Sequence, residues 1–181
     1  MQRSHRYRGF TVRRPALSVI TSVALLGSPT LSAGAGTTGS SGLLGSPALW
    51  ATVDVCQSAP AGDVVGLRGS MPGTGANNEQ MYMHFRLQYR GTRGNWHYVP
   101  GADSGLVDAG SAQFASRQVG LDFHLTPPAA AGGLVVRGVV WFEWRIKMRV
   151  VHATILHTTR GHDASAGASP PGFSAAHCAL S

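Results

Sequence analysis

The chain has 181 residues, enough for one domain with tails, and its 43% hydrophobic and 13% charged residues supply a core but little surface charge. The formal net charge of +7 is concentrated in five arginines within the first fourteen residues, and the rest of the chain holds 10 basic and 8 acidic residues. With basic and acidic residues so nearly equal in number, the rest of the chain lacks the clustered Lys and Arg that phosphate binding needs. This argues against a nucleic-acid partner.

The first 35 residues have the order of a signal peptide. An arginine-rich start precedes an apolar stretch, Ala16 to Gly27, which is too short to span a bilayer, and small residues follow. Ala33-Gly34-Ala35 has the small-x-small pattern of a cleavage site, so we expect export and cleavage after Ala35, with Ala33 as the second choice. An amphipathic or core helix is the alternative interpretation. Arg13-Arg14 leaves the twin-arginine route open beside general secretion.

Residues 36–49 are rich in Gly, Ser, Thr and Leu without periodicity, which predicts a flexible linker. We expect the folded domain over residues 50–181, with a loop or loosely packed tail from Gly161 to Phe173. Because no Cys follows the apolar segment in a lipid-anchor arrangement, we expect no membrane tether on the mature protein.

The clearest strand signal is the run Met81 to Arg90, in which apolar and polar residues alternate. A period of two over ten residues predicts a strand with one face in the core and one face in water. The run Gln118 to Leu125 repeats this pattern and ends before Pro127-Pro128. The inward residues of the first run are Met81, Met83, Phe85, Leu87 and Tyr89, and those of the second are Val119, Leu121, Phe123 and Leu125.

A longer and more apolar run, Leu134 to Ile146, predicts a central strand that places Phe142 and Trp144 inward. A tight turn at Lys147-Met148 would lead into a hairpin partner, Val150 to Thr159. This turn lacks the Gly or Asp usual for a hairpin, which leaves the register of the pair open.

Three shorter runs complete the set of predicted strands: Ala51 to Gln57, Val64 to Ser70 and Asn95 to Val99. About seven strands separated by Gly, Pro and Asn, with no convincing amphipathic helix, predict an all-β sandwich of the immunoglobulin or fibronectin III type.

Two cysteines, Cys56 and Cys178, bracket most of the predicted strands. If the chain is exported, they mature in an oxidising compartment, so we predict a disulfide that ties the two ends of the domain together. A pair of free or metal-binding thiols is the alternative, although neither cysteine lies in a CxxC or CxxH motif.

Several framework segments carry a resemblance to known proteins: the run Met83 to Gln88, then Trp96, Val99-Pro100, Val139 to Arg145, Thr158 to His162, and Pro170 to Ser174 before Cys178. In these segments the chain resembles a group of uncharacterised exported actinobacterial proteins. The resemblance covers roughly Cys56 to Cys178. It implies a single β-sandwich and export, and it implies no activity and no site residues.

The sequence carries none of the standard catalytic motifs that we sought: a GxSxG elbow, an HExxH pair, a P-loop or a calcium-binding loop. Seven histidines lie beyond the predicted cleavage site, but no two of them form a His-x-His pair. Asp122 and His124 share the polar face of one predicted strand and are the basis of an alternative, a small metal-dependent hydrolase. We predict instead a non-catalytic module without metal or cofactor.

Trp141 is the aromatic residue best placed to bind a ligand, because the alternation puts it on the strand face shared with Arg137 and Glu143. Arg86 and Arg90, on the polar face of another strand, could extend this surface and, with Arg93, come nearest to a basic patch. Charges that guard an exposed strand face are the preferred explanation for these arginines. We expect a monomer without nucleic-acid partner or membrane span. Its predicted partner is a protein or a cell-envelope glycan.

Removal of the signal peptide is directly measurable. The intact mass of protein recovered from the medium of an expressing actinobacterial culture should correspond to a chain that starts near Gly36. A full-length mass, or retention of the protein in the membrane fraction, would refute cleavage.

Overall fold

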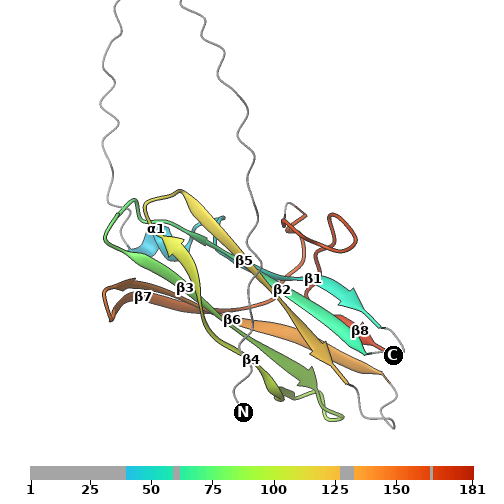
Figure 1. Cartoon of the computed structure of the whole chain (residues 1–181). Coiled ribbons are helices and arrows are strands. Elements are labelled where there is room, and N and C mark those ends of the chain that lie inside the picture. The colour runs from blue at the N-terminus through green and yellow to red at the C-terminus, as the bar shows by residue number, and fades with distance from the viewer. Residues whose placement is uncertain (1–39, 59–61, 127–132, 164) are drawn as a thin grey trace, which may run out of the picture. The chain divides into compact units, whose positions relative to one another are not determined.

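The computed structural model describes residues 40–58, 62–126, 133–163 and 165–181. Over these ranges the chain forms a pair of antiparallel sheets that face each other (Figure 1). The predicted all-β sandwich is confirmed. The smaller sheet has the strand order β1-β2-β5. Its strands are β1 (Trp50–Gln57), β2 (Asp63–Pro72) and β5 (Ser116–Leu125).

The larger sheet has the order β4-β3-β6-β7, and β8 pairs with β6 beyond the end of β7. Its strands are β3 (Gln80–Arg90), β4 (Trp96–Ser111), β6 (Leu134–Ile146), β7 (Arg149–His157) and β8 (Cys178–Leu180). The one helix in the described residues is α1 (Ser40–Leu44), and no described helix has the length and apolarity to cross a membrane.

The core lies between the sheets and is built mainly by β3 and β6. Their inward residues pair across the sheet, Met83 with Phe142 and Phe85 with Val140, and all four are fully buried. The predicted alternation of both strands is confirmed. Trp144 is also fully buried, and its indole Nε1 donates a hydrogen bond of 2.9 Å to the carbonyl oxygen of Pro72, at the end of β2.

Two glycines allow the sheets to approach closely. A Cβ atom on Gly69 of β2 would lie 2.8 Å from the Sδ atom of Met83, and one on Gly138 of β6 would lie 2.8 Å from a methyl group of Leu67. A side chain at either position would have to displace buried core side chains, so both glycines favour the close approach of the sheets.

The strand predicted from Asn95 to Val99 is much longer in the structure, where β4 continues to Ser111. The sequence concealed this because Pro100 and several glycines interrupt the alternation. Gln88 pairs with Tyr98 and Arg86 with Asp103, so residues 99–102 bulge out of the ladder opposite a single residue of β3.

The predicted turn at Lys147-Met148 joins β6 and β7 as expected. Lys147 has a φ angle of 55°, the left-handed conformation that Gly or Asn usually supplies in such turns. The sequence left the register of this pair of strands open. In the structure Trp144 pairs with His152 and Arg145 with Val150, so β7 has one extra residue between these two pairs.

The predicted start of the folded domain was Trp50, but the chain already packs into the sandwich before that residue. Within the linker expected over residues 36–49, the described residues start with α1, and Leu43 is only 2% exposed in the core, with Leu49 packed against it. The two leucines insert because the sandwich gains buried apolar area from them. The predicted signal peptide, residues 1–35, lies outside the described residues.

The C-terminal segment runs along the free edge of β1 before it returns to the larger sheet. Ala175 exchanges two backbone hydrogen bonds with Val53, and the Ser169 amide donates to the Asp54 carbonyl at 2.9 Å. The described residues of the tail expected from Gly161 to Phe173 form a loop, and the C-terminal segment meets β1 at two isolated bridges, Val53 with Ala175 and Val55 with Ser169, which cover part of its free edge.

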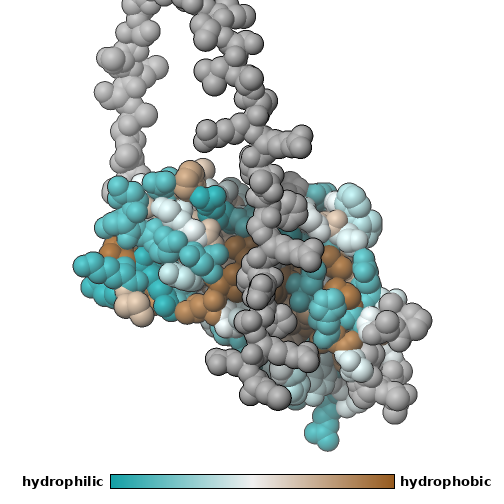
Figure 2. Space-filling model, viewed as in Figure 1, coloured by the Kyte–Doolittle hydropathy of each residue, from teal (hydrophilic) through white to brown (hydrophobic). Residues whose placement is uncertain are grey.

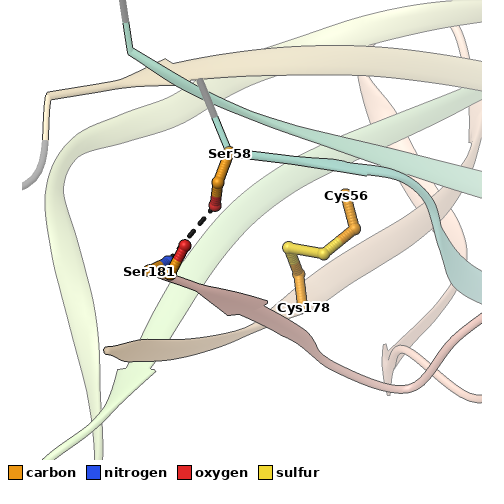
Figure 3. The surroundings of a disulfide bond; sticks show 4 residues. All are labelled: Cys56, Ser58, Cys178 and Ser181. Atoms are coloured by element: carbon orange, nitrogen blue, oxygen red, sulfur yellow. Dashed lines mark hydrogen bonds between the residues drawn. A yellow bond between two sulfur atoms is a disulfide. The ribbon is translucent and has the colours of Figure 1, made fainter. Parts of the chain in front are cut away.

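The predicted disulfide between Cys56 and Cys178 is confirmed (Figure 3). It joins β1 of the smaller sheet to β8 of the larger one, across a sequence separation of 122 residues. Nearby, the Ser181 amide donates to the Ser58 hydroxyl at 3.2 Å, so a second contact holds the chain end at the same place.

The opposite faces of β3 and β6 should differ sharply in their contribution to stability. We expect Phe85→Ala or Phe142→Ala to lower the free energy of unfolding by roughly 3–5 kcal/mol, because each leaves a cavity in the core. His84→Ala and Arg86→Ala, on the outer face, should each cost less than about 1 kcal/mol. Urea unfolding with the disulfide closed measures all four. Larger losses from the His84 and Arg86 variants would show that the outer face is the buried one.

Candidate functional site

A row of side chains crosses four strands on the outer face of the larger sheet. Leu106 of β4, His84 of β3, Trp141 of β6 and Ile155 of β7 are successive Cα partners and so lie on one face. Leu106 and Ile155 are 48% and 53% exposed. Large apolar side chains aligned on a solvated sheet face are typical of a contact surface.

Asp103 connects two basic side chains beside this row. Its carboxylate lies 2.6 Å from His84 Nε2 and 3.1 Å from Arg86 Nε. The backbone amide of Gly105 donates to the same carboxylate at 2.9 Å, and this bond, followed by the contact with His84, lowers the pKa of Asp103. Asp103 therefore stays ionised; it is hydrogen-bonded to His84, whereas its ion pair with Arg86 includes no hydrogen bond from the guanidinium Nε.

Aromatic stacking joins these residues to Trp141. Its indole stacks on the His84 ring at a centroid distance of 5.0 Å and on the Tyr98 ring at 6.3 Å. The Arg86 guanidinium lies 3.9 Å from the centroid of Tyr98. Together, His84, Arg86, Tyr98, Asp103 and Trp141 make a closed circuit of contacts, which we call the Trp141 cluster.

The structure brings together two of the three residues that the sequence singled out for binding. Trp141 and Arg86 belong to the Trp141 cluster, whereas Arg90 lies at the end of β3, paired with Trp96 and exposed. Tyr98 and Asp103 were not predicted from the sequence. Only the bulged register of β4 places them beside β3, and no local pattern encodes that register.

A second aromatic group lies further along the same sheet. The Arg137 guanidinium is 4.2 Å from the centroid of the Trp96 ring, which stacks on His177 at 5.4 Å. Arg137 Nε donates to Gln88 Oε1 at 2.9 Å. These contacts fix the tail just before Cys178 to the outer face of the larger sheet.

The segment Thr158 to His162 anchors the start of the tail. The Thr158 hydroxyl accepts a bond from the Gly138 amide at 3.0 Å and donates one to the Ala176 carbonyl at 2.7 Å. His162 stacks on Trp50 at 4.5 Å, and its Nε2 lies 2.9 Å from the Thr159 hydroxyl. These contacts are all internal to the domain and hold the start of the tail against β1 and β6.

Asp122 and His124, the basis of the hydrolase alternative, are exposed residues of β5 in the other sheet. Asp122 lies near Asp54, whose pKa is raised mainly by burial, despite an ion pair of 2.6 Å with Arg68. Within the described residues, no three His, Cys, Asp or Glu side chains are grouped so that they could hold a metal ion.

Comparison with known proteins adds little. No family model matches the chain, and no curated protein does. Among solved structures, 60% of the chain is similar to 30% of a Pseudomonas fluorescens alkylpurine DNA glycosylase bound to DNA containing an abasic site analog, with 12% identity and a TM-score of 0.28. The chain thus spans less than a third of that protein, and so slight a likeness carries no argument.

The lowered pKa values of two histidines predict how the stability of the domain depends on pH. Burial lowers the pKa of His157 and of His162 below 6.5, and the nearby Arg137 lowers that of His157 further. A lowered folded-state pKa means that the unfolded chain binds protons more readily, so stability is full above about pH 6.5 and decreases as pH falls through that value.

We therefore expect the thermal midpoint to fall between about pH 7.5 and pH 5.5, and to fall less in the double variant His157→Gln/His162→Gln. Asp54, whose pKa is raised, changes stability with pH in the opposite direction. It is present in every variant, so its effect cancels when the variants are compared. His124→Gln, an exposed histidine of β5, is the matched control and should keep the wild-type slope. An unchanged slope in the double variant would contradict this assignment.

Proposed function

We propose that this chain is an exported, non-catalytic binding module whose partner, a protein or a cell-envelope glycan, contacts the outer face of the larger sheet. The observation that carries the proposal is the row Leu106, His84, Trp141 and Ile155, in which exposed apolar residues flank the half-buried Trp141, reinforced by the Trp141 cluster. Trp, Tyr and Arg are the residue types that dominate binding energy at interfaces, and one of each lies in this cluster.

The Trp141 cluster also limits the entropic cost of binding. The hydrogen bond to Asp103 restrains His84, and ring contacts restrain Arg86 on Tyr98 and Trp141 on His84. A side chain already held in one arrangement loses less freedom when a partner binds, so more of the contact energy appears as affinity.

We propose further that the sandwich is of the immunoglobulin or fibronectin III type. The strand order supports this, because β1-β2-β5 facing β4-β3-β6-β7 corresponds to the A-B-E and C′-C-F-G sheets of fibronectin III domains. The added strand β8 and its disulfide to β1 are extra to that pattern.

Export belongs to the same proposal. The Cys56–Cys178 disulfide supports it, because such bonds form and persist in oxidising compartments. The predicted signal peptide supports the same conclusion from the sequence.

Binding to the cell envelope tests the proposal. Purified mature protein should co-sediment with insoluble envelope glycan or bind envelope proteins immobilised from actinobacterial cells. Trp141→Ala should weaken binding on the order of 30-fold, the effect of losing an interface hot spot. Isothermal titration with the solubilised partner would then give the loss for each variant.

Phe114→Ala is the matched control, since Phe114 is an exposed aromatic residue in the turn between β4 and β5. It should bind like the wild type, and circular dichroism should show that both variants are folded. Equal loss in both variants would refute the assigned surface. Metal-dependent release of soluble fragments from the glycan would overturn the non-catalytic assignment and support the hydrolase alternative.

A further inference from the structure

An apolar hollow opens between the two sheets, on the side where β4 and β5 are the edge strands. Its volume is about 530 Å³, within the range of small-molecule sites. In Figure 2, apolar surface gathers in a band between two hydrophilic ends of the domain. The apolar residues that line the hollow are Tyr89, Val99, Ala102, Phe123, Leu125 and Leu134, and all of them belong to the hydrophobic core or pack against it.

The bulge in β4 shapes this hollow. Residues 99–102 leave the pairing with β3, and all four line the hollow. Gly101 has a φ angle of 77°, and Pro100 before it cannot donate a ladder hydrogen bond, so both favour a bulge over a continuous strand. The wall of the hollow is therefore specified by the sequence of β4.

A second hollow, of about 590 Å³, adjoins the first and is basic. It is formed around the turn between β3 and β4 by Arg90, Arg93, Asn95 and His97, and it shares Tyr89 and Leu134 with the apolar hollow. No described residue that lines either hollow is acidic. Neither arginine has a carboxylate within ion-pair distance among the described residues.

We propose that the two hollows form one site for a single-chain anionic amphiphile, such as a monomeric fatty acid. The aliphatic chain occupies the apolar hollow between the sheets, and the anionic head group faces Arg90 and Arg93. The shared walls, Tyr89 and Leu134, make the chain and head subsites continuous. Charge complementarity selects an anion, because the unpaired guanidinium groups attract a negative head and repel a positive one.

The apolar half of this site is distinct from the surface proposed above. Tyr89 pairs with the fully buried Val136 and faces the interior of the sandwich, whereas the Trp141 cluster lies on the outer face of the same sheet. Each proposal can therefore fail while the other stands. In this proposal Arg90, which lies outside the Trp141 cluster, faces the anionic head group.

Titration of the mature protein with octanoate, decanoate and dodecanoate, all below their micellar concentrations, tests the proposal by calorimetry. Each added pair of methylene groups should tighten binding about 15-fold, as burial of an aliphatic chain requires. Dodecyltrimethylammonium, with the same chain and a positive head, should not bind. Equal binding of the cationic and anionic compounds, or no dependence on chain length, would overturn the proposal.

Variants assign the two halves of the site. Ala102→Phe should abolish dodecanoate binding by filling the apolar hollow, and Val99→Asp should do so by placing a carboxylate in its wall. Thermal unfolding shows whether each variant is folded, and Val99→Asp, at a half-buried position, decides the matter if Ala102→Phe does not fold. Dodecanoate binding retained in a folded Val99→Asp protein would refute the site.

Arg90→Ala/Arg93→Ala should weaken dodecanoate binding at least about tenfold, the loss of charge-assisted contacts to the head group. Lys147→Ala/Arg149→Ala removes the same charge from the β6–β7 turn and should have no effect. Vesicles of anionic phospholipid distinguish a membrane from a monomeric ligand. Vesicle binding that needs the two arginines but persists in the folded Val99→Asp variant would assign the basic hollow to a lipid surface and overturn the proposal.

Discussion

The packing of β3 and β6 against the smaller sheet determines where every other side chain of these strands can lie. Phe85, Phe142 and Trp144 are fully buried, and the Trp144 indole reaches across the core to the end of β2. Because successive residues of a strand point to opposite faces, burial of these residues forces His84 and Trp141 outward as neighbours. The proposed contact surface is thus a consequence of the core: a shift of one residue in either strand would remove it.

The C-terminal segment closes the sandwich. It covers part of the free edge of β1 and then adds β8 to the larger sheet, so one stretch of chain joins both layers. The Cys56–Cys178 bond fixes this return. The chain-entropy model gives a bridge of such length an upper value of about 4–5 kcal/mol, which is substantial beside the marginal stability of a small domain. The stacking of His162 on Trp50 and the bonds of Thr158 hold the intervening tail.

The irregularity of β4 connects the two proposed sites. The bulge at residues 99–102 places Tyr98 and Asp103 on the outer face beside Arg86 and turns Val99 and Ala102 toward the apolar hollow. A regular strand would alternate through this region and could supply neither arrangement. The bulge also breaks the outer edge of the larger sheet, which discourages pairing with another chain there. One local departure from the ladder therefore supports a contact face, a ligand wall and a protected edge.

The sequence by itself determined the strands with a long regular alternation, the inward position of Phe85 and Phe142, the turn at Lys147-Met148 and the pairing of the two cysteines. These features depend on local periodicity or on there being only two cysteines. Only the tertiary structure decided the extent of β4, the register of β7, the burial of Leu43, and the meeting of Tyr98 and Asp103 with Trp141. Each of these depends on which residues face each other across strands distant in sequence. A bulge changes that register without leaving a periodic signal, so no reading of one segment at a time could reveal it.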